Sequence, residues 1–125
     1  MARARRKTKS PRIKLAMRSE RDYQSCAERL KALADPDRLR IVNCLLLGPK
    51  NVSQVAKELN ETIVKVSHHL RVLRHARVVE TKKRGKFVIY SLDPAIADGD
   101  GRVSEMKTLD LGCCRLDLVQ SISPR

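Results

Sequence analysis

Aromatic side chains are almost absent from this chain. Tryptophan is missing, and Tyr23, Phe87 and Tyr90 are the only aromatic residues among 125. Proteins that bind RNA or single-stranded nucleic acid commonly stack bases on exposed rings. The lack of rings therefore argues against that class of protein. It also leaves a modest, aliphatic core for one domain with tails, and a partner subunit would help to cover that core.

Acidic residues are scarce relative to basic ones. The chain has 27 Lys and Arg against 14 Asp and Glu, a net charge of +13, and a pI near 10.2. Eight basic residues and no acidic ones lie in residues 1–18, which leaves 19 against 14 elsewhere. This excess favours a polyanionic partner, and duplex DNA fits it best. We interpret residues 1–19 as a basic disordered arm, which either adds non-specific attraction or follows phosphates or a minor groove.

Long hydrophobic runs and targeting signals are also missing. The stretch CLLLG, residues 44–48, is far too short to span a membrane. The Arg-rich start has the composition of a transit peptide but no clear apolar stripe, and no secretory signal is found. We therefore expect a cytoplasmic protein without a membrane partner. Its four cysteines are expected to be reduced thiols rather than a disulfide framework.

Signals that start and stop helices begin after the arm. Five apolar residues at helical spacing predict a first helix over residues 20–34: Tyr23, Ala27, Leu30, Leu33 and Ala34. Asp35 is a natural N-cap for a second, strongly apolar helix, with Pro36 at its first position and Gly48-Pro49 as its stop signal. A third helix follows, with Ser53 as the expected N-cap. Its inward face would consist of Val55, Ala56 and Leu59.

The segment ETIVKVSHHLRVLRHA, residues 61–76, predicts a fourth helix, which Thr62 can cap. Its apolar residues form one narrow stripe: Ile63, Val66, Leu70 and Leu73. The opposite side presents Val64, Lys65, His68, Arg71 and His75. The tight link from residues 53–59 predicts a helix-turn-helix. The β-prone runs that flank residues 82–86, KKRGK, predict a basic hairpin, so the layout is that of a winged helix.

The three histidines of this segment do not predict a metal site. A helix chelates a metal with histidines at i and i+4, whereas His68 and His75 lie two turns apart. We expect His69 to pack with a hydrogen bond and His75 to interact with the helix dipole. The sequence also has no phosphate-binding glycine loop and no convincing Cys–His dyad. No enzymatic activity is therefore expected.

The outward side of the fourth helix and the hairpin carry the predicted DNA contacts. The N-terminal half of such a helix enters the major groove deepest. There, Lys65 suits a guanine edge or a phosphate, and Val64 suits a thymine methyl group. The full set of predicted contacts is Thr62, Val64, Lys65, Ser67, His68, Arg71, Arg74, Lys82, Lys83, Arg84 and Lys86. The alternative for the hairpin is a solvated tip without contacts.

Four motifs between about residues 25 and 94 resemble the ArsR/SmtB family of bacterial winged-helix repressors. They are LKALADPDRLRIVNCLL, VSQVAKEL, VSHHLRVLRHARVVE and GKFVIYSLDP, in that order. The resemblance implies a homodimer that binds a palindromic operator and releases it when a metal, metalloid or oxidant alters the protein. Residues 20–95 would then form a winged helix-turn-helix domain, mainly α with a small β-hairpin wing. Two sites of the family are missing: VAKELNETI has no Cys-x-Cys, and no histidine follows His75.

The remaining segment, residues 96–125, contains the adjacent pair Cys113 and Cys114 and is a candidate dimerisation or sensor element. The leucines around the pair alternate but slip by one position there: Leu109 and Leu111, then Leu116 and Leu118. This pattern favours an extended segment with a bulge at the pair, which turns both thiols to the side of the leucines. The family resemblance implies a dimerising helix instead, at the cost of a central Gly112. Both remain open.

Two neighbouring thiolates suit a soft ion such as As(III), Cd(II) or mercury. Arsenite favours three sulfurs, and the third would come from Cys26, from Cys44 or from the other subunit. The resemblance favours Cys26, because the first and last segments of the family usually meet at the dimer interface. It adds that some arsenic-responsive members carry a C-terminal Cys-Cys. The alternatives are a redox disulfide and simple packing as small hydrophobes; for Cys44 we expect packing in the core.

The sequence therefore predicts a sequence-specific, DNA-binding transcriptional repressor with no required cofactor. A thiophilic metal or metalloid bound by Cys26, Cys113 and Cys114 would release it from its operator. Two alternatives remain: a repressor that responds to thiol oxidation, and an architectural protein that binds duplex DNA through charge without an effector.

Overall fold

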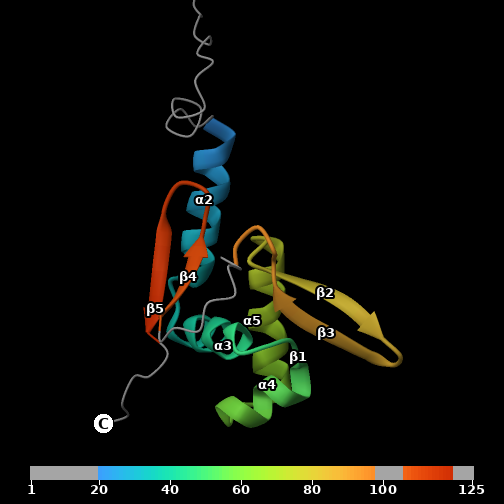
Figure 1. Cartoon of the computed structure of the whole chain (residues 1–125). Coiled ribbons are helices and arrows are strands. Elements are labelled where there is room, and N and C mark those ends of the chain that lie inside the picture. The colour runs from blue at the N-terminus through green and yellow to red at the C-terminus, as the bar shows by residue number, and fades with distance from the viewer. Residues whose placement is uncertain (1–19, 98–105, 120–125) are drawn as a thin grey trace, which may run out of the picture.

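The computed structural model describes residues 20–97 and 106–119, so the predicted arm lies outside the described residues. Figure 1 shows the arrangement of the elements. In chain order they are α2 (Glu20–Leu33), α3 (Pro36–Leu46), β1 (Lys50–Asn51), α4 (Val52–Leu59), α5 (Ile63–His75), β2 (Val79–Arg84), β3 (Phe87–Leu92), β4 (Met106–Asp110) and β5 (Arg115–Val119). No helix in the described part of the chain is both long and apolar enough to cross a membrane.

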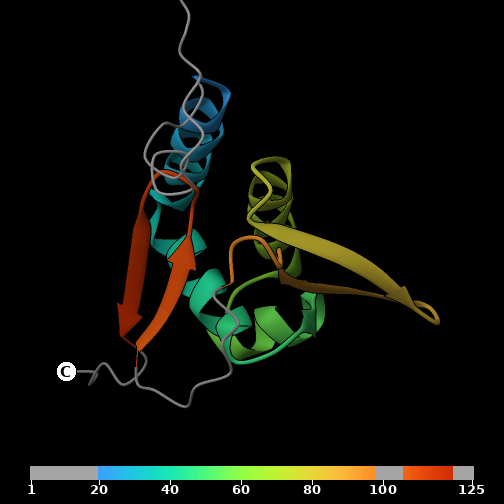
Figure 2. The ribbon, with the colours of Figure 1, turned by 45° about the horizontal axis from the view of Figure 1, so that its top comes forward.

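The predicted hairpin consists of β2 and β3, which form an antiparallel sheet of order β1-β3-β2 with the short strand β1. Arg84 pairs with Phe87 at its tip, which leaves Gly85 and Lys86 as a two-residue turn. Gly85 has a φ of 62°, a left-handed conformation that glycine adopts without steric cost. Figures 1 and 2 show β2 and β3 projecting away from the helices, so the wing is confirmed.

Side-chain caps start three of the helices. Asp35 Oδ1 accepts from the backbone N–H of Asp37 at 2.8 Å, and Thr62 Oγ1 accepts from that of Lys65 at 3.2 Å, as the sequence predicts. The predicted cap Ser53 is wrong. Asn51 caps α4 instead, because its side chain and that of Gln54 exchange reciprocal hydrogen bonds of 2.8 Å with each other's backbone N–H.

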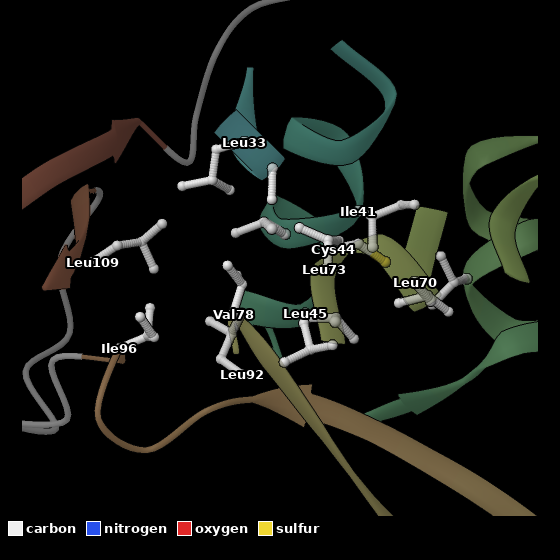
Figure 3. Packing of buried hydrophobic residues seen from close by; sticks show 14 of the residues in the cluster. Leu33, Ile41, Cys44, Leu45, Leu70, Leu73, Val78, Leu92, Ile96 and Leu109 are labelled. Atoms are coloured by element: carbon white, nitrogen blue, oxygen red, sulfur yellow. The ribbon is translucent and has the colours of Figure 1, made fainter. Parts of the chain in front are cut away.

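The inward side of α5 lies at the centre of the aliphatic core. Val66, Leu70 and Leu73 are at most 1% exposed, and Figure 3 shows the two leucines among side chains from α3, such as Ile41. Ile63, the fourth residue of the predicted stripe, is 50% exposed. Its predicted burial is wrong, because it is the first residue of the helix and the core begins one turn later.

The first predicted helix is confirmed as α2, but most of its predicted apolar stripe lies on the surface. Tyr23 is 50% and Leu30 is 38% exposed, whereas the buried side consists of Cys26, Ala32 and Leu33. The C-terminal hairpin β4–β5 lies beside α2, on the side of the molecule away from the wing (Figures 1 and 2). Cys26 and the last turn of α2 are therefore buried, whereas the side of the helix with Tyr23 and Leu30 is exposed.

The C-terminal segment is extended, so the helix that the family resemblance implies is wrong for this chain. The bulge is also wrong, because the phase slip at the cysteines is a turn between β4 and β5. Leu109 pairs with Leu116, and the backbone N–H of Leu111 donates to the carbonyl of Cys114 at 2.9 Å. Gly112 has a φ of 103°, which glycine alone adopts readily. Leu109 and Leu111 are fully buried, which joins this hairpin to the core.

We expect Leu73→Ala to lower the free energy of unfolding by about 2–5 kcal/mol, because it removes a fully buried side chain and leaves a cavity. Urea denaturation followed by circular dichroism measures the change. Leu47, which is 64% exposed, provides the control: Leu47→Ala should change stability by less than about 0.5 kcal/mol. Equal losses for the two variants would contradict this packing.

Cys44 is 3% exposed in the core, as expected, and burial raises the pKa of its thiol to about 11. We expect iodoacetamide at pH 8 to modify the half-buried free thiol of Cys114 well before Cys44, because the thiolate is the reacting form. Mass spectrometry of timed samples measures the order. In urea both thiols should react at similar rates, and a Cys44 that reacts as fast as Cys114 in the folded protein would contradict its assignment to the core.

Candidate nucleic-acid interface and thiol cluster

The outward side of α5 carries the predicted contacts at the surface. Val64 is 80% exposed, and Lys65 and His68 are exposed in the same N-terminal half of the helix. Arg71 and Arg74 continue this surface one turn later, whereas Ser67 is half-buried. Thr62 is exposed, but its hydroxyl oxygen is engaged in the cap. The inward packing of α5 thus leaves a mixed polar and basic surface on the other side.

The wing adds a second basic surface. All four of its predicted contacts are exposed: Lys82, Lys83, Arg84 and Lys86. Phe87, which the sequence reasoning did not select, is 51% exposed at the tip opposite Arg84. Phe87 is one of only three aromatic residues in the sequence. Its position next to the predicted turn could have indicated that it lies at the tip of the wing.

Lys65 is held between two carboxylates. Its Nζ lies 3.3 Å from Glu61 Oε1 and 3.5 Å from Asp37 Oδ2, and 47% of its side chain remains exposed. A hydrogen bond to Glu61, together with the charge of Asp37, raises the pKa of the Lys65 ammonium group above its ordinary value. The i,i+4 spacing of Glu61 and Lys65 could have revealed the first contact from the sequence. Asp37, on another helix, could not be found that way.

Asp37 also joins Lys65 to the buried histidine. His69 is 9% exposed; its Nδ1 accepts from Arg38 Nη1 at 3.1 Å, and its Nε2 lies 3.6 Å from Asp37 Oδ2. The predicted hydrogen-bonded packing of His69 is therefore confirmed. Partial burial acts to raise the pKa of the Asp37 carboxyl, but its hydrogen bond from Arg40 and the charge of Lys65 outweigh this and hold that pKa below its ordinary value.

Asp35, Asp37 and His69 bring three potential metal-ligating atoms within 4.8 Å of one another. Two of these groups already have cationic side-chain partners, and Asp35 accepts from backbone N–H groups. Arg38 binds the histidine ring, and Lys65 lies against the Asp37 carboxylate. The chemistry of this cluster is that of an ion-pair network between α3 and α5, rather than that of a metal site.

The three cysteines selected from the sequence lie together. Cys26 and Cys113 form a disulfide, and Cys114 Sγ lies 3.8 Å from Cys26 Sγ. The expectation that all four cysteines are reduced is therefore wrong for this pair, whereas Cys44 and Cys114 are free. The turn at Leu111–Cys114 places both C-terminal sulfurs against α2, 87 residues away in sequence, and no pattern in the sequence fixes that approach.

Arg29, one turn after Cys26, lies beside this thiol cluster. Its Nη1 donates to the carbonyl of Leu111 at 3.2 Å, and its Nε is buried with no hydrogen-bond partner among the described residues. In the reduced chain, three sulfurs within 4.8 Å of one another would suit a soft ion; in the oxidised chain they link α2 to the C-terminal hairpin.

Residues 35–81 match the family model described as "Bacterial regulatory protein, arsR family". The transcriptional repressor SdpR of Bacillus subtilis is 33% identical over 66 residues, which cover 53% of this chain and 73% of SdpR. The CadC homologue of Staphylococcus aureus, a cadmium resistance transcriptional regulatory protein, is 40% identical over 68 residues, which cover 54% of this chain and 56% of that protein.

Among solved structures, the homodimeric winged helix-turn-helix DNA-binding domain Mb0332 of Mycobacterium bovis is similar, with a TM-score of 0.56 and 27% identity. The similarity covers 62% of this chain and 75% of that domain, which is described as a possible ArsR-family transcriptional regulator. The helix-turn-helix with its wing is the fold that these relatives share. The chain therefore belongs to the ArsR family of bacterial transcriptional regulators.

Proposed function

We propose that the chain is a sequence-specific repressor that binds duplex operator DNA through α5 and the wing. The observation that carries this proposal is the division of α5 into two sides, since Leu70 and Leu73 are fully buried while Lys65 and His68 are exposed. A recognition helix needs both sides: one that attaches it to the core and one that carries donors for base edges. The cytoplasmic nucleoid is the compartment that this role requires.

The proposed contacts differ in kind. Lys65, Ser67 and His68, with the Val64 methyl groups, face base edges, and Thr62 stands at the helix start. Arg71 and Arg74 make no ion pair within the described chain, so their charges are available to phosphates. The exposed cations of the wing would meet the backbone of the flanking groove: Lys82, Lys83, Arg84 and Lys86.

We propose a homodimer that reads two half-sites. The support is the exposed apolar side of α2, where Tyr23 and Leu30 lie at the surface, and the homodimeric state of Mb0332. A second copy would cover side chains that are costly to leave in water. Two-fold symmetry of the protein would then match a palindromic operator.

The proposed effector is a thiophilic ion of the As(III) or Cd(II) type, bound by Cys26, Cys113 and Cys114 after their disulfide is reduced. Three sulfurs within 4.8 Å of one another suit such an ion, and the guanidinium of Arg29 would offset part of the thiolate charge. Because Cys26 lies on α2, which packs on α3 and α5, an ion there acts on the element behind the recognition helix. The CadC homologue is a cadmium resistance regulator, which adds weight to this class of ion.

A second candidate is a repressor that responds to oxidation, and the Cys26–Cys113 disulfide favours it. Loss of two electrons and two protons from these thiols to a cellular oxidant would link α2 to the C-terminal hairpin. Reduction would free that hairpin again. This candidate needs no metal, so its DNA affinity would change with redox state alone.

We expect As(III) or Cd(II), added in stoichiometric amounts to the reduced protein, to lower operator affinity by about 5- to 150-fold, the usual range of coupling between two sites. Fluorescence anisotropy of labelled operator measures the affinity, and ultraviolet sulfur-to-metal absorption measures the binding. The double variant Cys113→Ser/Cys114→Ser should keep its operator affinity and lose the response; Zn(II) serves as the comparison ion.

An unchanged response in that double variant would remove the thiol cluster as the sensor. If the affinity of the metal-free protein changes on oxidation alone, the redox candidate replaces the ion. A salt series with operator and random duplexes tests repression itself. Equal affinities and equal slopes for the two duplexes would support the architectural alternative instead.

A further inference from the structure

Lys65 differs from the other cations of the proposed interface because it alone is flanked by carboxylates. Its Nζ lies within 3.5 Å of both Glu61 and Asp37, yet 47% of its side chain is exposed. The two acids are 29% and 22% exposed, so they are next to the surface rather than beneath it. The question is what such a Lys–acid group can bind on DNA.

A phosphate is a poor partner for this group. Two carboxylates beside the ammonium would approach the anionic phosphate together with it, and their repulsion would cancel much of the attraction. No carboxylate forms an ion pair with Arg71 or Arg74 among the described residues, so these side chains bind phosphates without that cost. On α5, acids thus compensate the charge of Lys65 but not the charges of Arg71 and Arg74.

A base edge in the major groove provides what the group needs. Guanine presents two neighbouring acceptors, N7 and O6, and the N4 amino donor of its paired cytosine lies beside them. An ammonium can bridge the two acceptors while a carboxylate accepts from the amino group. The edge of an A·T pair places a donor between its two acceptors, so an ammonium there meets an N–H group. One cation beside one acid therefore matches the acceptors and the donor on the major-groove edge of a G·C pair.

We propose that Lys65 and Glu61 read a G·C base pair, Lys65 at guanine and Glu61 at the cytosine amino group, rather than a phosphate. Asp37 is a positioning residue in this proposal, because it holds Lys65 from α3 and is itself held by Arg40 and by His69, 3.6 Å away. The proposal rests on the proposed operator binding and names one base pair in each half-site.

The experiment selects bound duplexes from a random library with the reduced full chain and with four variants. Lys65→Ala should lose the G·C preference at one position per half-site, a change of about tenfold or more in relative affinity, while Lys65→Arg should keep the guanine preference. Glu61→Gln should weaken discrimination at that position and raise affinity for random duplexes. Arg71→Ala is the matched control and should lower affinity for all duplexes by one common factor.

Replacing that guanine by 7-deazaguanine, which lacks N7, should weaken the wild-type chain and leave Lys65→Ala unchanged. If Lys65→Ala instead weakens every duplex equally and reduces the salt slope by about one, Lys65 binds a phosphate and the proposal is overturned. A sequence preference that survives Lys65→Ala intact overturns only this proposal, whereas a wild-type chain that selects no sequence overturns the proposed function as well. Circular dichroism verifies that each variant is folded.

Discussion

The packing of Val66, Leu70 and Leu73 into the aliphatic core holds α5 in place, and the proposed recognition surface depends on it. Burial of each such side chain contributes about 1.5–3 kcal/mol, which far exceeds any single surface ion pair. The same contact fixes the rotation of α5 about its axis. A rotation of about 100° in one direction would expose Leu70 and carry Lys65 toward the core. The opposite rotation would expose Leu73 and carry Arg74 toward the core. Apolar packing therefore decides which polar groups lie on the surface that we propose to face DNA.

Charges refine this surface after packing has oriented it. Asp37 at the start of α3 binds Lys65 and approaches His69, both on α5, so two helices of the core are linked by ion pairs close to the proposed groove contact. Such partly exposed pairs add little stability. Their effect is to restrict where the Lys65 ammonium can lie, and a restricted cation discriminates between partners better than a free one does.

The thiol cluster connects the two ends of the described chain. Cys26 lies in α2, and Cys113 and Cys114 lie in the turn of the C-terminal hairpin, so any bond or ion there couples that hairpin to the helix it packs against. Because α2 in turn contacts α3 and α5, a change at the sulfurs has a continuous packed route to the recognition helix. The small size of the core makes such a local cross-link matter more than it would in a larger domain.

Local sequence determined most of the winged helix-turn-helix. The caps Asp35 and Thr62, the 3.6-residue period of α5 and the glycine turn of the wing act between near neighbours, so they are readable without coordinates. The same period predicts which side of α5 is exposed. The family motifs predict the order of the helices and the hairpin, and the match to the family model agrees with it.

Tertiary structure decided what depends on distant contacts. Two contacts join segments whose spacing in sequence carries no periodic signal: Cys26 with Cys113, and Asp37 with Lys65. The exposure of Tyr23 likewise depends on which elements pack against α2. The physical reason is that hydrophobic periodicity shows that a helix has an apolar side but not which neighbour covers it. That choice is made by the packing of the whole chain.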